Sequence, residues 1–181
     1  MAYIEGILKA YETHKMVDGR FVLDNRGRTI GYGHGVREGE DFSDGLSETE
    51  ALELAIADMD EKYSVIIKCM QEINGMTGLN LNERNFSENE IMFLVDFAYN
   101  SGRGLVKWPG LSDDQPHTSL ALLIIAVSEG DDEKIISILK EEVLNGEGEY
   151  YRGLEKRRMD EYEILKEGDY ERDDDMERGV W

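Results

Sequence analysis

The sequence predicts an α+β fold that is mainly helical, with a small antiparallel β-lobe near the N-terminus and a long inter-lobe helix. Between about residues 13 and 45, glycines and β-type residues replace the helical period. One apolar face at helical spacing then extends from Leu52 to Met70, and shorter helical patterns follow it. Since no repeat or linker is visible, we expect one domain over residues 1–166 and an acidic tail over residues 167–181.

Local signals predict where each element begins and ends. Apolar residues at helical spacing indicate a short first helix over residues 3–11. Antiparallel hairpin segments of one small sheet are expected between residues 13 and 36. Ser47 and Ser87 each precede a glutamate by three positions, which is the capping-box pattern that begins a helix. We expect Asn74-Gly75 to end the long helix.

The second half of the chain reads as four further helices. The helix that follows Ser87 is apolar almost all round, so it should lie at the centre of the core, and the Asn100-Ser101-Gly102 sequence should end it. Shorter helices are expected over residues 119–128, 132–144 and 154–166. Gly168 is the expected residue just after the last of them.

Composition excludes several classes of function. The chain has 20 basic and 40 acidic residues, a net charge of −20, which argues against binding of nucleic acid or anionic membranes. The longest apolar run, residues 120–127, is too short to span a membrane, and the N-terminus resembles no signal peptide. Cys69 is the only cysteine, so it is expected to be a buried thiol.

The stretch from Asp24 to Gly35 is rich in glycine. Gly31 and Gly33 alternate with β-type residues, which indicates a strand with one bare face against which a ligand could lie. A tight bulge or hairpin is the alternative interpretation.

The arrangement of reactive side chains favours carboxylate chemistry without a cofactor. The three histidines are far apart, and no metal-binding spacing, nucleophile elbow or P-loop lysine is present. Cleavage of a glycosidic bond needs a protonated acid and a second group that positions water. Glu5 and Asp24 are candidates for these roles, although the sequence pattern by itself favours Glu5 as a surface residue of the first helix.

Four blocks in order resemble the phage-type lysozymes, which are endolysins with muramidase activity. They are Glu5-Gly6 with Lys9-Ala10-Tyr11, then residues 29–34 (Thr-Ile-Gly-Tyr-Gly-His), residues 97–102 (Phe-Ala-Tyr-Asn-Ser-Gly) and residues 153–158 (Gly-Leu-Glu-Lys-Arg-Arg). The resemblance implies a lysozyme-like fold and a glycoside hydrolase that cleaves the β-1,4 bond between N-acetylmuramic acid and N-acetylglucosamine in peptidoglycan.

The resemblance also implies roles for individual residues. Glu5 would be the general acid, and Asp24 and Thr29 would position the attacking water, in an inverting arrangement. Asp24 and Thr29 are one residue closer than is usual in the family, so Asp18 is the alternative second carboxylate. Tyr32 and Asn100 are candidates to line the cleft, and Trp108, on a loop, could either stack on a sugar of the substrate or anchor that loop.

Other residues in these blocks have structural interpretations. We expect His34 to end a strand and pair with an acid, and Arg157 and Arg158 to hold the last helix against acidic residues. A lytic transglycosylase on the same bond, and a non-catalytic wall-binding or structural phage tail domain, are the alternative functions.

The expected partner is the peptidoglycan polysaccharide, with a larger phage or tail assembly as a further one that the resemblance allows. Without a signal peptide, the protein is expected in the host cytoplasm until release or delivery to the bacterial cell wall.

Overall fold

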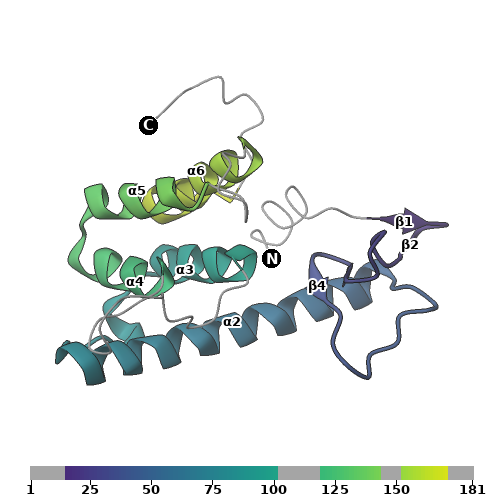
Figure 1. Cartoon of the computed structure of the whole chain (residues 1–181), viewed down its shortest axis with the longest axis horizontal. Helices are drawn as coiled ribbons and strands as arrows, with labels where there is room; N and C mark the ends of the chain where they lie inside the picture. Colours follow the sequence, from purple (N-terminus) through teal and green to yellow (C-terminus); the bar gives the residue numbers. More distant parts are fainter. Residues whose placement is uncertain (1–14, 102–118, 144–151, 171–181) are drawn as a thin grey trace. The chain divides into compact units, whose positions relative to one another are not determined.

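The computed structural model describes residues 15–101, 119–143 and 152–170, and it is mostly helical with two small antiparallel hairpins. The chain divides into two compact units, and the division falls after Glu61, inside the longest helix. Residues 15–61 and Tyr170 belong to the first unit, and the other described residues belong to the second. The α+β prediction is confirmed (Figure 1).

The first unit contains two separate two-stranded sheets. β1 (Met16–Val17) pairs with β2 (Arg20–Phe21), and β3 (Thr29–Ile30) pairs with β4 (His34–Gly35), both antiparallel. Asp18 and Gly19 connect β1 to β2 with φ values of 50° and 77°, as a type I′ turn requires. Phe21 also forms an isolated bridge with Leu46. The prediction of one small sheet was therefore wrong, although its antiparallel hairpins are present.

Gly31 and Gly33 form the turn between β3 and β4. Their φ values of 62° and 92° lie in the left-handed region, which only glycine adopts at little cost. A Cβ atom on Gly31 would lie 3.2 Å from the Cβ atom of Ala51. These glycines thus allow a tight turn and its close packing on a helix, so the prediction of a strand with a bare face was wrong and the hairpin alternative is confirmed.

Helix α2 (Glu48–Thr77) begins at the predicted capping box. The backbone amide of Ser47 donates to Glu50 Oε2 over 2.7 Å, and the Glu50 amide donates to Ser47 Oγ over 3.3 Å. The helix continues past Asn74-Gly75, where it was predicted to end, and the Asn74 side chain bonds to the backbone of Leu81, beyond the helix end. Gly78, with a φ of 77°, follows the helix end instead.

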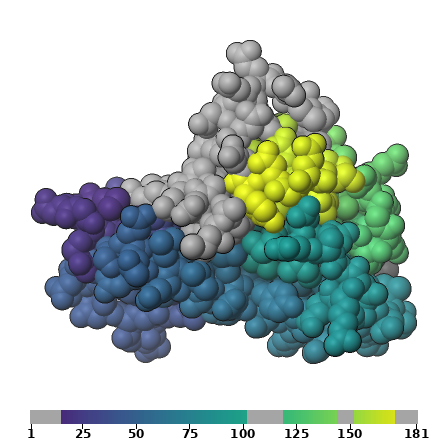
Figure 2. All heavy atoms as spheres, turned by 180° about the vertical axis from the view of Figure 1, so that it is seen from behind, coloured from purple at the N-terminus to yellow at the C-terminus, as the bar shows by residue number. Residues whose placement is uncertain are grey.

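The second unit packs its helices around α3 (Glu88–Ser101), which contacts α4 (Ser119–Glu129) and α6 (Arg152–Glu167). Figure 2 shows side chains of α6, in yellow, against those of α3, in teal. The short 3₁₀ helix η2 (Glu83–Asn85) precedes α3, and α5 (Asp132–Glu141) packs on α4. Residues 93–98 of α3 are buried, as predicted for a central helix.

Most predicted helix ends lie within a few residues of those in the structure. The Ser87 amide donates to Glu90 Oε2 over 2.6 Å, which confirms the second capping box. Helix α5 ends at Glu141, before the predicted residue 144, and α6 begins at Arg152, before residue 154. Gly168, with a φ of 67°, follows α6 as predicted. Cys69 is fully buried, also as predicted.

Two predicted segments lie outside the described residues. They are the first helix, over residues 3–11, and the acidic tail beyond residue 170. Among the described helices, none has the length and apolar character needed to cross a membrane.

Candidate functional site

Asp24 organises a closed loop between β2 and β3. Its Oδ1 atom accepts hydrogen bonds from the amides of Arg26, Arg28 and Thr29 over 3.2, 2.6 and 3.3 Å. The Asp24 amide donates to the Thr29 carbonyl over 2.9 Å, and Gly27 donates to the Asp24 carbonyl over 3.0 Å. Six residues are therefore held in one shape by a single side chain and its own peptide groups.

The same hydrogen bonds favour the ionised form of Asp24. The amide of Arg28 makes the largest contribution, and the net effect lowers the pKa of this carboxyl below its ordinary value. A side-chain hydrogen bond from Thr29 acts in the same direction. Asp24 is therefore an anion at neutral and mildly acidic pH.

The structure brings together two of the predicted catalytic residues, Asp24 and Thr29. Both are partly exposed and both belong to the closed loop. Asp18, the alternative carboxylate, lies in the exposed turn between β1 and β2. Of the two carboxylates, Asp24 is therefore the one that the structure joins to Thr29 by hydrogen bonds.

Tyr32, predicted to contact substrate, is only 3% exposed. Its ring packs edge-on against Phe21, with centroids 5.1 Å apart, and its hydroxyl donates to Glu48 Oε1 over 3.4 Å. These contacts give Tyr32 a clear part in packing the β-lobe against the first turn of α2.

Asn100, the other described substrate-contact candidate, lies near the end of α3 in the second unit. Its side-chain oxygen accepts a hydrogen bond from Arg158 Nη2. Glu5 and Trp108, the predicted acid and the predicted stacking residue, lie outside the described residues.

The two predicted bracing arginines are buried between α3 and α6. Arg157 Nη2 lies 2.9 Å from Asp96 Oδ1, and Arg158 Nη1 lies 2.8 Å from Glu161 Oε2. The Arg158 guanidinium also covers the Phe97 ring at 4.8 Å from its centroid. The pair with Asp96 of α3 confirms the structural interpretation of Arg157, whereas Glu161, the acid that pairs with Arg158, lies in α6 itself.

His34 is the second polar centre of the first unit. Its Nδ1 lies 2.7 Å from Asp58 Oδ2 and its Nε2 lies 2.9 Å from Glu40 Oε2. Burial opposes the charged imidazolium, but the hydrogen bonds and negative charges of Glu40 and Asp58 outweigh it and raise the pKa of His34. The prediction that His34 pairs with an acid is confirmed, but His34 begins β4 and does not end a strand.

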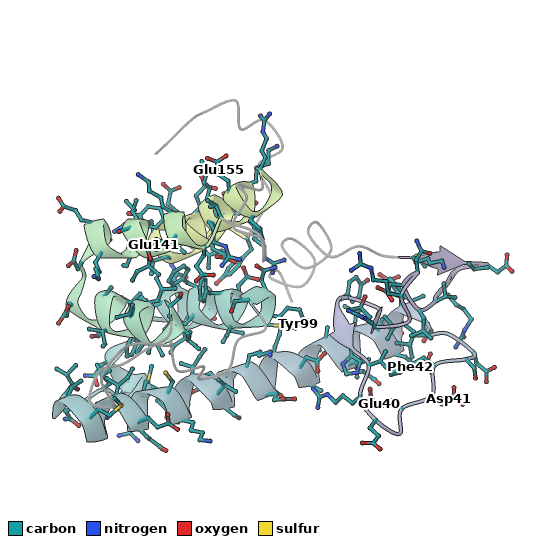
Figure 3. All side chains as sticks on the ribbon, viewed as in Figure 1. Glu40, Asp41, Phe42, Tyr99, Glu141 and Glu155 are labelled. Atoms are coloured by element: carbon teal, nitrogen blue, oxygen red, sulfur yellow. The ribbon has the colours of Figure 1, made fainter. Side chains whose placement is uncertain are left out.

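The loop after β4 completes this centre. Figure 3 shows Glu40, Asp41 and Phe42 in that loop, and the Phe42 ring packs edge-on against His34 with centroids 5.8 Å apart. Arg37 joins α2 through Asp58 and Glu61, at 3.0 and 2.6 Å. This network ties the loop after β4 to α2.

Sequence reasoning did not identify Asp58 and Glu40 as the partners of His34. A signal for Asp58 was nevertheless present, because it continues the buried face of α2 that begins with Ala51 and Ala55. An aspartate on such a face needs a partner. Glu40 lies in an irregular loop and gave no comparable signal.

Among the residues that the structure describes, no group of three or more histidine, cysteine, aspartate or glutamate side chains is placed to hold a metal ion.

Comparison with models of protein families, with curated proteins and with solved structures finds no match to this chain.

Proposed function

We propose that this protein is a peptidoglycan hydrolase that cleaves the β-1,4 bond between N-acetylmuramic acid and N-acetylglucosamine. The observation that carries the proposal is the joining of Asp24 and Thr29 in one braced loop. The four ordered sequence blocks that resemble phage-type lysozymes, and the α+β fold with its early hairpins, support it.

The proposed reaction uses two carboxyl groups. The carboxylic acid of Glu5 gives its proton to the glycosidic oxygen as the bond to the anomeric carbon breaks. The anionic Asp24 takes a proton from a water molecule that attacks that carbon from the opposite face, with inversion. The product is a new reducing end.

The geometry of Asp24 suits this second role. All three loop amides bind Oδ1, and a carboxylate has further acceptor sites on Oδ2 for water. The lowered pKa keeps Asp24 ionised under conditions in which an acid such as Glu5 has to be protonated. The Thr29 hydroxyl supplies a second group to orient the water.

The proposal predicts that Glu5→Gln abolishes clearing of a peptidoglycan suspension while the melting temperature stays nearly unchanged. Asp24→Asn keeps an oxygen that can accept the loop amides but removes the charge, so its clearing rate should fall by at least about a hundredfold. Asp18→Asn, in the neighbouring turn, is the matched control and should clear at the wild-type rate.

Analysis of the products by mass spectrometry completes the test. Reducing muramic ends support hydrolysis, whereas exclusively anhydro ends would identify a transglycosylase. Equal clearing by wild type and Glu5→Gln would reject Glu5 as the acid. Absence of any clearing by the wild type would favour a wall-binding or structural role.

A further inference from the structure

The loop that Asp24 holds also presents two arginines, in the basic part of a strongly acidic chain. Residues 15–37 contain five basic side chains and two acidic ones, a net charge of +3 within a chain of −20. An acidic chain repels an anionic wall. The stretch of sequence that contains the proposed site therefore differs in charge from the rest of the chain.

Three of these five basic side chains have partners inside the first unit. Arg20 bonds to the carbonyls of Asp44 and Gly45, and Arg37 pairs with two acids of α2. Lys15 donates to the side-chain oxygen of Asn25 over 3.1 Å, which leaves its charge uncompensated.

Arg26 and Arg28 differ from these three. Both side chains are exposed, and neither pairs with an acidic group among the residues that the structure describes. Their backbone amides are two of the three that donate to Asp24 Oδ1, at 3.2 and 2.6 Å. The two guanidinium groups are thus carried by a backbone that is already fixed, so little ordering of the loop would oppose their binding to a ligand.

We propose that Arg26 and Arg28 form an anion-binding surface that recognises the carboxylates of the peptide stems on the glycan strand. A guanidinium binds a carboxylate through two parallel hydrogen bonds. The stem is attached to the muramic acid residue, and therefore lies beside the bond that the same loop would act on. This inference rests on the proposed function and adds that the enzyme distinguishes substituted from bare glycan.

The test separates binding from cleavage. Wild type, Arg26→Gln/Arg28→Gln and a control, Lys68→Gln/Arg84→Gln, are sedimented with purified peptidoglycan that has been freed of wall polymers. The control makes the same change in charge at two exposed positions in the second unit. Melting temperatures of all three proteins are measured to establish that each is folded.

We expect about fivefold less Arg26→Gln/Arg28→Gln than wild type to be retained on the sedimented peptidoglycan. Loss of two exposed ion pairs with the ligand accounts for an effect of this size. The control should be retained like wild type, and the loss should shrink at high salt. On glycan whose stems have been removed by an amidase, wild type and Arg26→Gln/Arg28→Gln should be retained equally.

Three outcomes would overturn the proposal. They are equal retention of wild type and variant on intact peptidoglycan, the same loss on stripped glycan, and a loss seen only on walls that carry phosphodiester polymers. Because retention is measured without turnover, a protein that binds in this manner but releases no reducing ends would reject the proposed hydrolysis and leave the role of the two arginines standing.

Discussion

His34 illustrates how one residue can make the stability of a small lobe depend on pH. It is 3% exposed, and both ring nitrogens face carboxylates. Only the doubly protonated ring can donate to both Asp58 and Glu40, because the neutral ring has one N–H group. The raised pKa of His34 in the folded chain expresses this preference.

We predict that His34→Gln lowers the stability of the protein more at pH 5.5 than at pH 9. The pKa of His34 is higher in the folded chain than the unfolded value of about 6.5, so its contribution to the free energy of unfolding is complete below about pH 6.5. It is lost as the pH rises through the folded pKa. At pH 5.5 the cost should be about 2 kcal/mol, measured by denaturant unfolding.

Arg37→Gln serves as the control for this comparison. Arg37 touches the same Asp58, but its raised pKa keeps it charged at both pH values, so its cost should change little between them. A cost of His34→Gln that is the same at pH 5.5 and pH 9 would contradict the assignment of an imidazolium.

At the scale of elements, the backbone bridge between Phe21 and Leu46 joins β2 to the segment that precedes α2. The two residues exchange both backbone hydrogen bonds at 2.8 Å. Gly45 lies beside them, and a Cβ atom there would come within 2.5 Å of the Phe21 carbonyl oxygen. Backbone cannot move away as cheaply as a flexible side chain.

We predict that Gly45→Ala destabilises the protein at least twice as much as Gly39→Ala. Both glycines have φ values in the left-handed region, 67° and 89°, which costs alanine about 1 kcal/mol. Only Gly45 adds a clash, since nothing lies within 4 Å of a Cβ atom on Gly39. Thermal unfolding of both variants measures the difference. Equal losses of stability would show that the backbone around the Phe21–Leu46 bridge can shift at little cost.

The interface between α3 and α6 depends on charges that have no access to water. Asp96 and Glu161 are fully buried, and Arg157 contacts both of them, at 2.9 and 3.4 Å. Burial raises the pKa of Glu161 well above its ordinary value, against the opposing effect of the two arginines.

We predict that Arg157→Met costs about 3 kcal/mol of unfolding free energy, because it leaves a buried acid without its cation. Lys166→Met is the control. It breaks a 2.6 Å pair with Asp132 whose side chains are both more than 40% exposed, and it should cost less than about 1 kcal/mol. Similar costs for the two variants in denaturant unfolding would mean that the buried pair contributes no more than the exposed one.

At the scale of the whole chain, the sequence predicted the helices better than the β-lobe. Serine and glutamate three positions apart identified the starts of α2 and α3, because the capping bonds are local. The end of α2 was misplaced because two glycines lie close together there, and Gly78, with a left-handed φ of 77°, follows the helix instead of Gly75. The alternation of glycines and β-type residues around Gly31 suggested a strand. The positive φ values of Gly31 and Gly33 make this segment a turn, and φ values cannot be obtained from the sequence pattern.

The candidate site was predictable only where its residues are neighbours in the chain. Spacing and resemblance were enough to pair Asp24 with Thr29. They did not predict that Asp24 Oδ1 accepts hydrogen bonds from the amides of its own loop. Asp58 and Glu40 meet His34 from two different segments, and such meetings depend on tertiary packing. The charge of residues 15–37, by contrast, can be counted directly from the sequence.

The brace around Asp24 has a consequence for engineering. It uses backbone amides, so the side chains at positions 25, 26 and 28 do not set the shape of the loop. The side chains at positions 25, 26 and 28 can be replaced together, provided that Asp24 and Gly27 are kept. A library limited to these three positions should therefore yield folded proteins that differ in the charge and size of the side chains on this loop.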